Sequence, residues 1–449
     1  MNSNNKVFDN IIRVFLILEL VSIGWLCSGT RVQYVMIMVT IAVLPALFIL
    51  FNKVFLKHNF TISKYEIYAY CISILFLIYI LIQSINVRVV KFSAEGYSVY
   101  EPKEHLLFLP SCIYKPFSDF NNTTYFALYI GLICFGILCY FLLKNIRFAK
   151  IAMGCFVIST LLMGCFAAWQ KFNYEIMYDR FFSVGDFYGT FFLKNAAGAF
   201  FSIGIIVALS FWFIPLKIRL QKFIYCSLTL FASALLTYVV YDTKSEGALL
   251  FCGAIWIVFF ILLFFCLIRS LRYQKVIVIS TLLLLLLLSI IACCLLRNSR
   301  ESINTDIITS FNARISINKN NIEIFKNYPI YGIGTSCYDY NLNKIINKEK
   351  DYANVYKYIE IYDPHNSIFA YLIRHGLVGG LMIIQMFILW FVLFIKKKMF
   401  LRPENIFIFC GALTCMMYGL IDMHLSSIPS TMFAFVFLIV LSISNLREI

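Results

Sequence analysis

The stretch SIFAYLIRHGLVGGLMIIQMFILWFVLFIKKK, residues 367–398, is apolar over most of its length and then ends in three lysines. A helix rises 1.5 Å per residue, so about 20 apolar residues cross the hydrocarbon core of a bilayer. Lysines directly after such a run are typical of the cytoplasmic end of a membrane helix. The stretch therefore predicts a membrane-spanning helix and also its direction.

The whole chain repeats this pattern. Of its 449 residues, 61% are hydrophobic and 14% are charged, and its mean hydropathy is +0.83. Such a composition excludes a soluble protein of this length, and continuous rather than alternating apolar runs favour helices over a barrel. We expect an all-α integral membrane protein, one polytopic domain over 1–449, with about twelve spans of roughly 20 residues each. The expected spans are 11–28, 32–51, 65–85, 123–143, 149–169, 196–216, 223–241, 247–268, 275–296, 367–395, 403–421 and 430–446.

The basic residues predict the orientation. With both termini in the cytoplasm, each short cytoplasmic loop carries about three of them, which is the positive-inside pattern. These residues are Lys53, Lys57 and Lys64; Lys144, Arg147 and Lys150; Lys217, Arg219 and Lys222; Arg269, Arg272 and Lys275; and Lys396, Lys397, Lys398 and Arg402. The net charge of +15 therefore reflects the membrane topology. No nucleic-acid-binding module is recognisable in the sequence.

The fifteen cysteines do not form a disulfide framework, because nearly all of them lie inside apolar spans, where cysteine behaves as a small hydrophobe. Cys112 and Cys337 alone fall in long outside loops, and whether they pair is left open. No Cys/His spacing indicates a metal site.

Polar residues concentrate on the outside face. The largest outside loop, 297–366, is about 70 residues long and precedes the tenth expected span; long loops on a membrane scaffold are usually functional or disordered. Arg180, Lys244, Arg314 and His365 all fall on this face. Converging basic groups favour an anionic ligand, and the setting favours one whose tail lies in lipid.

The motif PHNSIFAYLIRHGLVGG, 364–380, begins with a proline that fixes the backbone before a helix. Asn366 or Ser367 can cap that helix, which places His365 at its N-terminus near free backbone amides, a setting that favours anions. The alternative for His365 is an interfacial histidine that caps a turn. Arg374 and His375 are expected to line a polar interior or to reach the surface. Close helix packing is expected at Gly376, Gly379 and Gly380.

The stretch 311–340 places Arg314 at the start of an amphipathic segment, with a short helix expected over 316–328. Tyr328 and Pro329 end the segment, and Gly332 and Gly334 make a turn. An arginine fork suits a phosphate or diphosphate, whereas the alternative is a solvated arginine on a surface helix.

Three further stretches lie on the same face. In DRFFSVGDFYGTFFLKNAAGAFF, 179–201, Asn195 enters a helix and Arg180 precedes it in a loop. In YDTKSEGALLF, 241–251, Lys244 sits in a short turn that either lines a cavity or simply connects two helices. The last outside turn, 421–430, adds Asp422 and His424.

Together these motifs resemble the O-antigen ligase and O-antigen polymerase superfamily, over roughly 180–380. PHNSIFAYLIRHGLVGG is similar to the family's histidine-asparagine motif, and ARI…NYPIYGIGTSCY to its arginine followed by a proline-x-x-glycine-x-glycine turn. GTFFLKNAAGAFF and KSEGALL resemble two further segments. The chain departs from the pattern at Glu246, where the family has arginine, and at Leu193 and Lys194, where it has asparagine and proline.

The resemblance implies a bacterial inner-membrane glycosyltransferase of the lipid-sugar-using C type, inverting and independent of metal or other cofactors. It would take a glycan from undecaprenyl diphosphate on the periplasmic face and pass it to an acceptor sugar, in lipopolysaccharide biosynthesis. Arg314, Arg180 and Lys244 would bind the diphosphate, and His365 would position or deprotonate the acceptor. Asn195, Asn366, Gly332 and Gly334 are the expected supporting residues.

The motifs leave the acceptor open: a lipid core, another lipid-linked glycan or a protein. The alternative from another class is a transporter that flips lipid-linked sugars. A transporter is expected to carry ionisable residues near mid-membrane and repeat symmetry, whereas the polar residues here gather at the outer ends of the spans.

Overall fold

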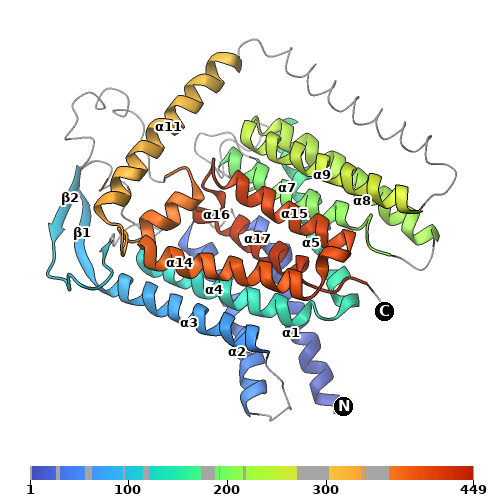
Figure 1. The fold of residues 1–449 in the computed structure, drawn as a ribbon, viewed down its shortest axis with the longest axis horizontal. Helices are drawn as coiled ribbons and strands as arrows, with labels where there is room; N and C mark the ends of the chain where they lie inside the picture. Colours follow the sequence, from blue (N-terminus) through green and yellow to red (C-terminus); the bar gives the residue numbers. More distant parts are fainter. Residues whose placement is uncertain are drawn as a thin grey trace.

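The computed structural model describes the whole chain except residues 1–2, 27–30, 56–62, 95–96, 115–120, 173–187, 192, 216–218, 271–302, 336–337, 339–340, 342–363 and 448–449. The described part is a bundle of helices with a small sheet at one end (Figure 1). The helices are α1 (Ser3–Trp25), α2 (Val32–Phe55), α3 (Lys64–Ile85), α4 (Asn122–Leu142), α5 (Ile146–Phe172), α7 (Lys194–Ser210), α8 (Arg219–Asp242), α9 (Glu246–Ser270), α11 (Ile303–Asn327), α14 (Ser367–Lys396), α15 (Pro403–Tyr418), α16 (His424–Ser427) and α17 (Pro429–Ser442).

Apolar composition accounts for most of these helices. Every expected span except 275–296 coincides in large part with a described helix, and 275–296 lies outside the described residues. Within the described residues, seven helices are long and apolar enough to cross a membrane: α2, α3, α4, α5, α8, α9 and α14. A largely helical membrane protein is therefore confirmed, and the count of twelve spans stays a prediction.

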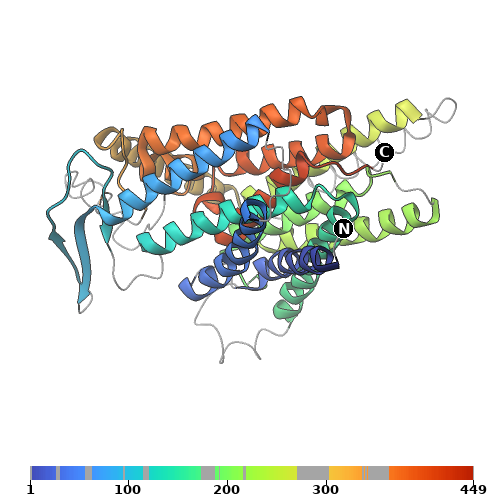
Figure 2. The same cartoon turned by 90° about the horizontal axis from the view of Figure 1, so that it is seen from below.

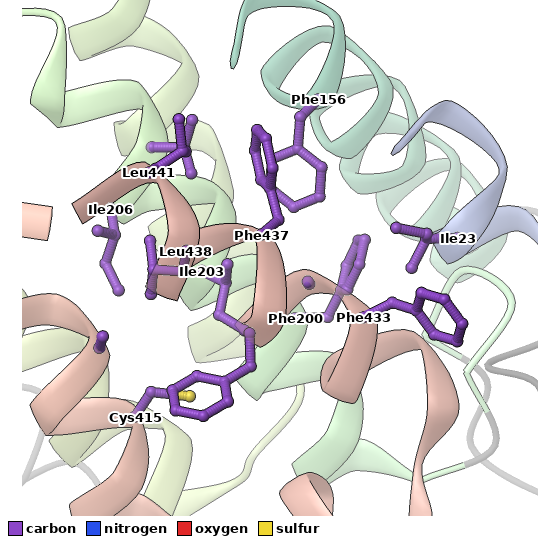
Figure 3. Close-up of a cluster of buried hydrophobic side chains, with 14 of the residues drawn as sticks. Ile23, Phe156, Phe200, Ile203, Ile206, Cys415, Phe433, Phe437, Leu438 and Leu441 are labelled. Carbon is purple, nitrogen blue, oxygen red and sulfur yellow. The ribbon is translucent and has the colours of Figure 1, made fainter. Parts of the chain in front are cut away.

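The core lies around two short helices, α7 and α17, whose residues are almost all buried. A helix that is apolar all round belongs inside a bundle rather than at its lipid-facing surface. On α17, Phe437 packs against Phe156 of α5 with ring centroids 5.4 Å apart, and Phe156 also meets Phe200 of α7 at 5.8 Å (Figure 3). These two helices thus form the centre around which the longer ones are arranged.

The described part is largely helical, as expected, and adds one small sheet of three strands. Its strands are β1 (Val87–Ala94), β2 (Tyr97–Pro102) and β3 (Cys112–Tyr114), in the order β2-β1-β3. β1 pairs antiparallel with β2 and parallel with β3, and the hairpin projects beyond the end of α3 (Figures 1 and 2). The sequence signal for this hairpin is the run VRVVKFSAEGYSVYEP, 87–102, which is rich in valine and aromatic residues on both sides of a glycine.

Helix α11 begins well before the expected 316–328 helix and ends at Asn327, directly before Tyr328 and Pro329 as expected. Gly332 and Gly334 follow with φ angles of 71° and 91°, which glycine adopts without steric cost. The expected turn after this helix is therefore confirmed.

This turn inserts into a break in α14. At Gly376 the backbone of α14 leaves the helical conformation, with φ 61° and ψ −165°. The N–H groups of Ile333 and Gly334 donate to the carbonyls of Ile373 and Arg374, at 2.8 and 3.0 Å. After the break, the N–H groups of Leu377 and Val378 donate back to the carbonyls of the turn, those of Pro329 and Ile330, at 2.8 and 3.2 Å. Gly376 is thus a helix break, where the sequence analysis expected only close packing.

Side chains from α3 and α4 form hydrogen bonds with the residues at the break. The Tyr79 hydroxyl donates to the carbonyl of His375 at 2.7 Å, and Gln83 Nε2 donates to that of Arg374 at 2.9 Å. The imidazole of His375 lies between Gln83 Oε1, at 3.1 Å, and the Tyr129 hydroxyl, at 3.0 Å. Arg374 donates to the carbonyl of Ser426 at 2.6 Å. The polar interior expected for Arg374 and His375 is confirmed.

The opposite end of α14 is basic. Lys144 pairs with Glu66 at 3.2 Å, and both Lys144 and Lys397 lie within 5 Å of the Tyr140 ring centroid. Lys396 lies over Tyr65 in the same way. Three loops predicted to be cytoplasmic therefore meet at one end of the bundle, and the side of the membrane that this end faces stays a prediction.

The break at Gly376 gives a stability prediction. An alanine Cβ at this position would lie 2.2 Å from the carbonyl oxygen of Ile330 and would need a positive φ. Gly376→Ala should therefore cost at least about 1–3 kcal/mol, the usual cost of such backbone strain. The measurement is the apparent Tm of the purified protein in detergent.

The matched control is Gly253→Ala in α9, where an added Cβ meets nothing within 4 Å. Because alanine favours a helix over glycine by about 1 kcal/mol, its Tm should stay equal or rise. Equal Tm values for the two variants would contradict the role of Gly376.

Candidate active site

The N-terminus of α14 is built by Asn366. Its Oδ1 accepts from the N–H groups of Ile368 and Phe369 at 3.0 and 3.1 Å, and its Nδ2 donates to the carbonyl of Leu420 at 2.7 Å. Asn366 is therefore the cap, one of the two that the sequence analysis considered. His365 directly precedes it, partly buried and with φ 51°, a backbone conformation rare outside glycine.

The first amides of α14 are not free, which corrects the expected anion site. In addition to the two that Asn366 binds, the N–H of Ser367 donates to the carbonyls of Gly419 and Asp422, at 2.7 and 3.1 Å. The Ser367 hydroxyl also donates to the Asp422 carbonyl at 2.8 Å. An anion beside His365 would therefore have to be held by side chains rather than by these amides.

Asp422 lies at the centre of this end of the bundle, with 3% of its surface exposed. Its Oδ2 accepts from Asn195 Nδ2 at 2.5 Å, and its Oδ1 accepts from the N–H of Met423 at 2.8 Å. Burial raises the pKa of the Asp422 carboxyl above its ordinary value, and the charges of His365 and Arg314 oppose that rise. His365 and Arg314 are therefore both close enough to act on this carboxylate.

Asn195 connects Asp422 to two further elements. Its Oδ1 accepts from the hydroxyl of Ser245 at 2.6 Å, and its carbonyl accepts from the Tyr418 hydroxyl at 3.4 Å. The start of α7, the turn between α8 and α9 and the end of α15 thus converge here. Lys244 is exposed, with φ 52°, next to the buried Ser245.

Arg314 reaches this region from α11. Seven residues along, and so on nearly the same helical face, Asn321 donates through Nδ2 to the carbonyl of Pro364 at 3.0 Å. Asn321 in turn accepts from the hydroxyl of Tyr338 at 2.7 Å. This contact holds α11 against the segment that carries His365. Arg314, two turns before Asn321 on the same helix, is partly buried.

Gly332 and Gly334, in the turn after α11, contact α14 near its break, farther from its N-terminus than His365. A Cβ on Gly332 would meet the backbone of Ile373 and Arg374, and one on Gly334 would lie 2.8 Å from Cys112 Cα. Both glycines therefore allow the turn to approach α14 and β3 closely.

The structure thus brings together His365, Asn366, Asn195 and Asp422, with Arg314 close by. Arg180 and Cys337 lie outside the described residues, as does any pair of Cys337 with Cys112. The sequence analysis gave no role to Asp422 or to Ser245, although both were visible as polar residues in outside turns. Their convergence follows from helix packing, which no local pattern reports.

His424, the other histidine near Asp422, differs from His365 in its burial. His424 is fully buried, and its ring stacks on that of Tyr418 with centroids 4.5 Å apart. Burial lowers its pKa to about 3, so the ring is neutral at physiological pH. Within the described residues, no three His, Cys, Asp or Glu side chains lie close enough together to hold a metal ion.

Residues 229–384 match the sequence model of the O-antigen ligase family. The match includes Lys244, Arg314, Gly332 and Gly334 as well as His365 and Asn366, and it begins after Asn195. A comparison with curated proteins found no match. The resemblance to the O-antigen ligase and polymerase superfamily is thereby confirmed over 229–384, and the apolar helices indicate a multi-pass membrane protein.

Proposed function

We propose that the protein is an inverting glycosyltransferase that moves a glycan from undecaprenyl diphosphate to an acceptor sugar at the periplasmic face of the bacterial inner membrane. One observation carries the proposal: the buried Asp422 contacts the N-terminus of α14 directly after His365, and the charges of His365 and Arg314 act on its carboxylate. That arrangement offers a proton acceptor and a fixed cation at the depth where a lipid-linked diphosphate would sit.

The donor half of the reaction concerns the leaving group. As the bond between the anomeric carbon and the diphosphate oxygen breaks, negative charge develops on that oxygen. Fixed cations stabilise such charge in the transition state, and an arginine can bind two phosphate oxygens at once. Arg314 is the proposed main cation, with Arg180 and the exposed Lys244 as further contacts for the diphosphate. No metal ion is required by this scheme.

The acceptor half concerns a sugar hydroxyl, which attacks the anomeric carbon from the face opposite the diphosphate and must lose a proton. His365 is the proposed residue that positions this hydroxyl and takes the proton. A neighbouring carboxylate stabilises the imidazolium that forms, and Asp422 supplies it. Asn195 and the N–H of Met423 orient that carboxylate by hydrogen bonds.

The acceptor determines whether the protein is a ligase or a polymerase, since the donor chemistry is the same in both. A surface-glycan ladder from cells that lack the gene separates them. A single repeat unit on the lipid core would indicate a polymerase. Bare core, with long glycan accumulating on the lipid carrier, would indicate a ligase, and loss of glycan from a protein would indicate a protein acceptor.

A flippase for the same lipid-linked sugars remains the alternative from another class. It moves its substrate across a bilayer and makes no new bond. Product formed by the purified protein in detergent micelles, where no bilayer separates two sides, would therefore support the enzyme and contradict the flippase.

Arg314→Ala and His365→Ala should each lower glycan transfer by at least about 10²-fold, the usual effect of removing one group that stabilises a transition state. The measurement is the rate of undecaprenyl diphosphate release by purified protein in detergent. The matched control is Lys319→Ala, which removes an exposed cation from the same helix as Arg314. Unchanged rates in the first two variants, with normal glycan in cells, would refute the proposed site.

Asp422→Asn should lower the rate and change its pH dependence. Since burial raises the pKa of this carboxyl, it takes up a proton at a higher pH than an exposed aspartate. If the ionised form supports His365, the wild-type rate falls as the pH drops through that raised pKa, and the part of the fall that comes from this carboxyl is absent from the variant. Identical acid limbs in the two pH profiles of kcat/KM would contradict this role.

A further inference from the structure

The loop between β2 and β3 presents three consecutive large apolar side chains to its surroundings. Leu106, Leu107 and Phe108 are 52%, 84% and 69% exposed. The residues just before them are charged: Lys103 pairs with Glu101 at 2.6 Å, and both side chains are about half exposed. An exposed apolar tip on a segment outside the helices marks a contact with a partner or with a membrane.

The loop is attached to the end of a membrane helix. Asn86, the residue that follows α3, accepts through Oδ1 from the N–H of Leu106 at 2.9 Å. Its Nδ2 donates to the carbonyls of Leu106, Leu109 and Pro110 at 2.9, 3.3 and 3.2 Å. One side chain therefore fixes the backbone of the loop at the level where α3 ends.

The exposed face of helix α3 indicates whether lipid or water surrounds the protein at that level. Its exposed apolar residues recur at helical spacing, three or four apart, and form one stripe along the helix: Ile74, Ile78, Leu81 and Ile85. Because α3 is long and apolar enough to span a membrane, this stripe faces lipid. Ile85 is 71% exposed, and Asn86 directly follows it. The lipid-facing stripe thus runs up to the residue that holds the loop.

We propose that Leu106, Leu107 and Phe108 form an interfacial anchor that inserts into the lipid monolayer at the end of α3. The occupant is phospholipid, at the boundary between head groups and acyl chains, rather than a protein partner. The continuity of the stripe with the loop carries the assignment, since both belong to the same end of one helix. Lys103 and Glu101 remain in water, where a charged pair needs no desolvation.

The anchor acts on the site through the sheet. On β1, Arg88 donates through Nη2 to the carbonyl of Ile333 at 3.3 Å, and its guanidinium lies 4.6 Å from the Tyr328 ring centroid. The strand therefore supports the turn that enters the break of α14. Seating the sheet on the bilayer holds that turn at a constant depth relative to a lipid-linked substrate.

The test is the depth of a tryptophan placed in the loop. Leu107→Trp replaces an exposed side chain by another apolar one, so it removes no internal packing. In phospholipid vesicles, the emission added above that of the five native tryptophans should be blue-shifted. It should be lost when the lipid is brominated near the glycerol end of the acyl chains, and retained when iodide is added to the water.

The matched control is Glu101→Trp on β2, whose added emission should respond in the opposite way, with loss in iodide and none with brominated lipid. Phe108→Trp repeats the test at the neighbouring position. Loss of the Leu107→Trp and Phe108→Trp emission in iodide would overturn the proposal, because the loop would then lie in water. Protection from both quenchers would also overturn it, because a protein contact would then cover the loop.

Discussion

The break of α14 at Gly376 is the feature on which the rest of the polar end depends. A helix broken inside a membrane bundle leaves carbonyls on one side of the break and N–H groups on the other, and each costs several kcal/mol when unpaired in a medium without water. The turn at 329–334 satisfies both sets with its own backbone. Tyr79 and Gln83 bind carbonyls next to the break. The break is therefore possible only because this turn is present.

The same insertion determines where α11 lies. The helix ends at Asn327, so fixing the turn within α14 fixes the end of α11 beside it. Asn321 then bonds to the carbonyl of Pro364, and Arg314 lies two turns farther back. Two segments far apart in the sequence, one with a cation and one with a histidine, are thus held together by the backbone hydrogen bonds of the turn and the side chain of Asn321, rather than by a contact between their charges.

Several local features were predictable from sequence, and each rests on neighbouring residues. Asn366 was expected as one of two caps, the end of α11 before Tyr328 and Pro329 followed from the proline, and the turn at Gly332 and Gly334 followed from the glycines. The hairpin of β1 and β2 was not predicted, because the expected elements were apolar runs of about 20 residues and its strands are shorter and less apolar. The break at Gly376 was not predicted, because a glycine that breaks a helix and one that only allows close packing have the same local sequence. The backbone angles of Gly376, φ 61° and ψ −165°, distinguish them.

The sequence alone determined that the chain is a largely helical membrane protein, where most of its helices lie, and that polar groups stand in the turns between them, because hydrophobicity is a property of single residues and their neighbours. The tertiary structure decided which of those groups meet. Asp422 became the centre of the candidate site because α7, α15 and the α8–α9 turn pack together, which buries its carboxylate and brings Asn195 to it. Burial and long-range hydrogen bonds depend on all the packed helices at once, so no short stretch of sequence contains them.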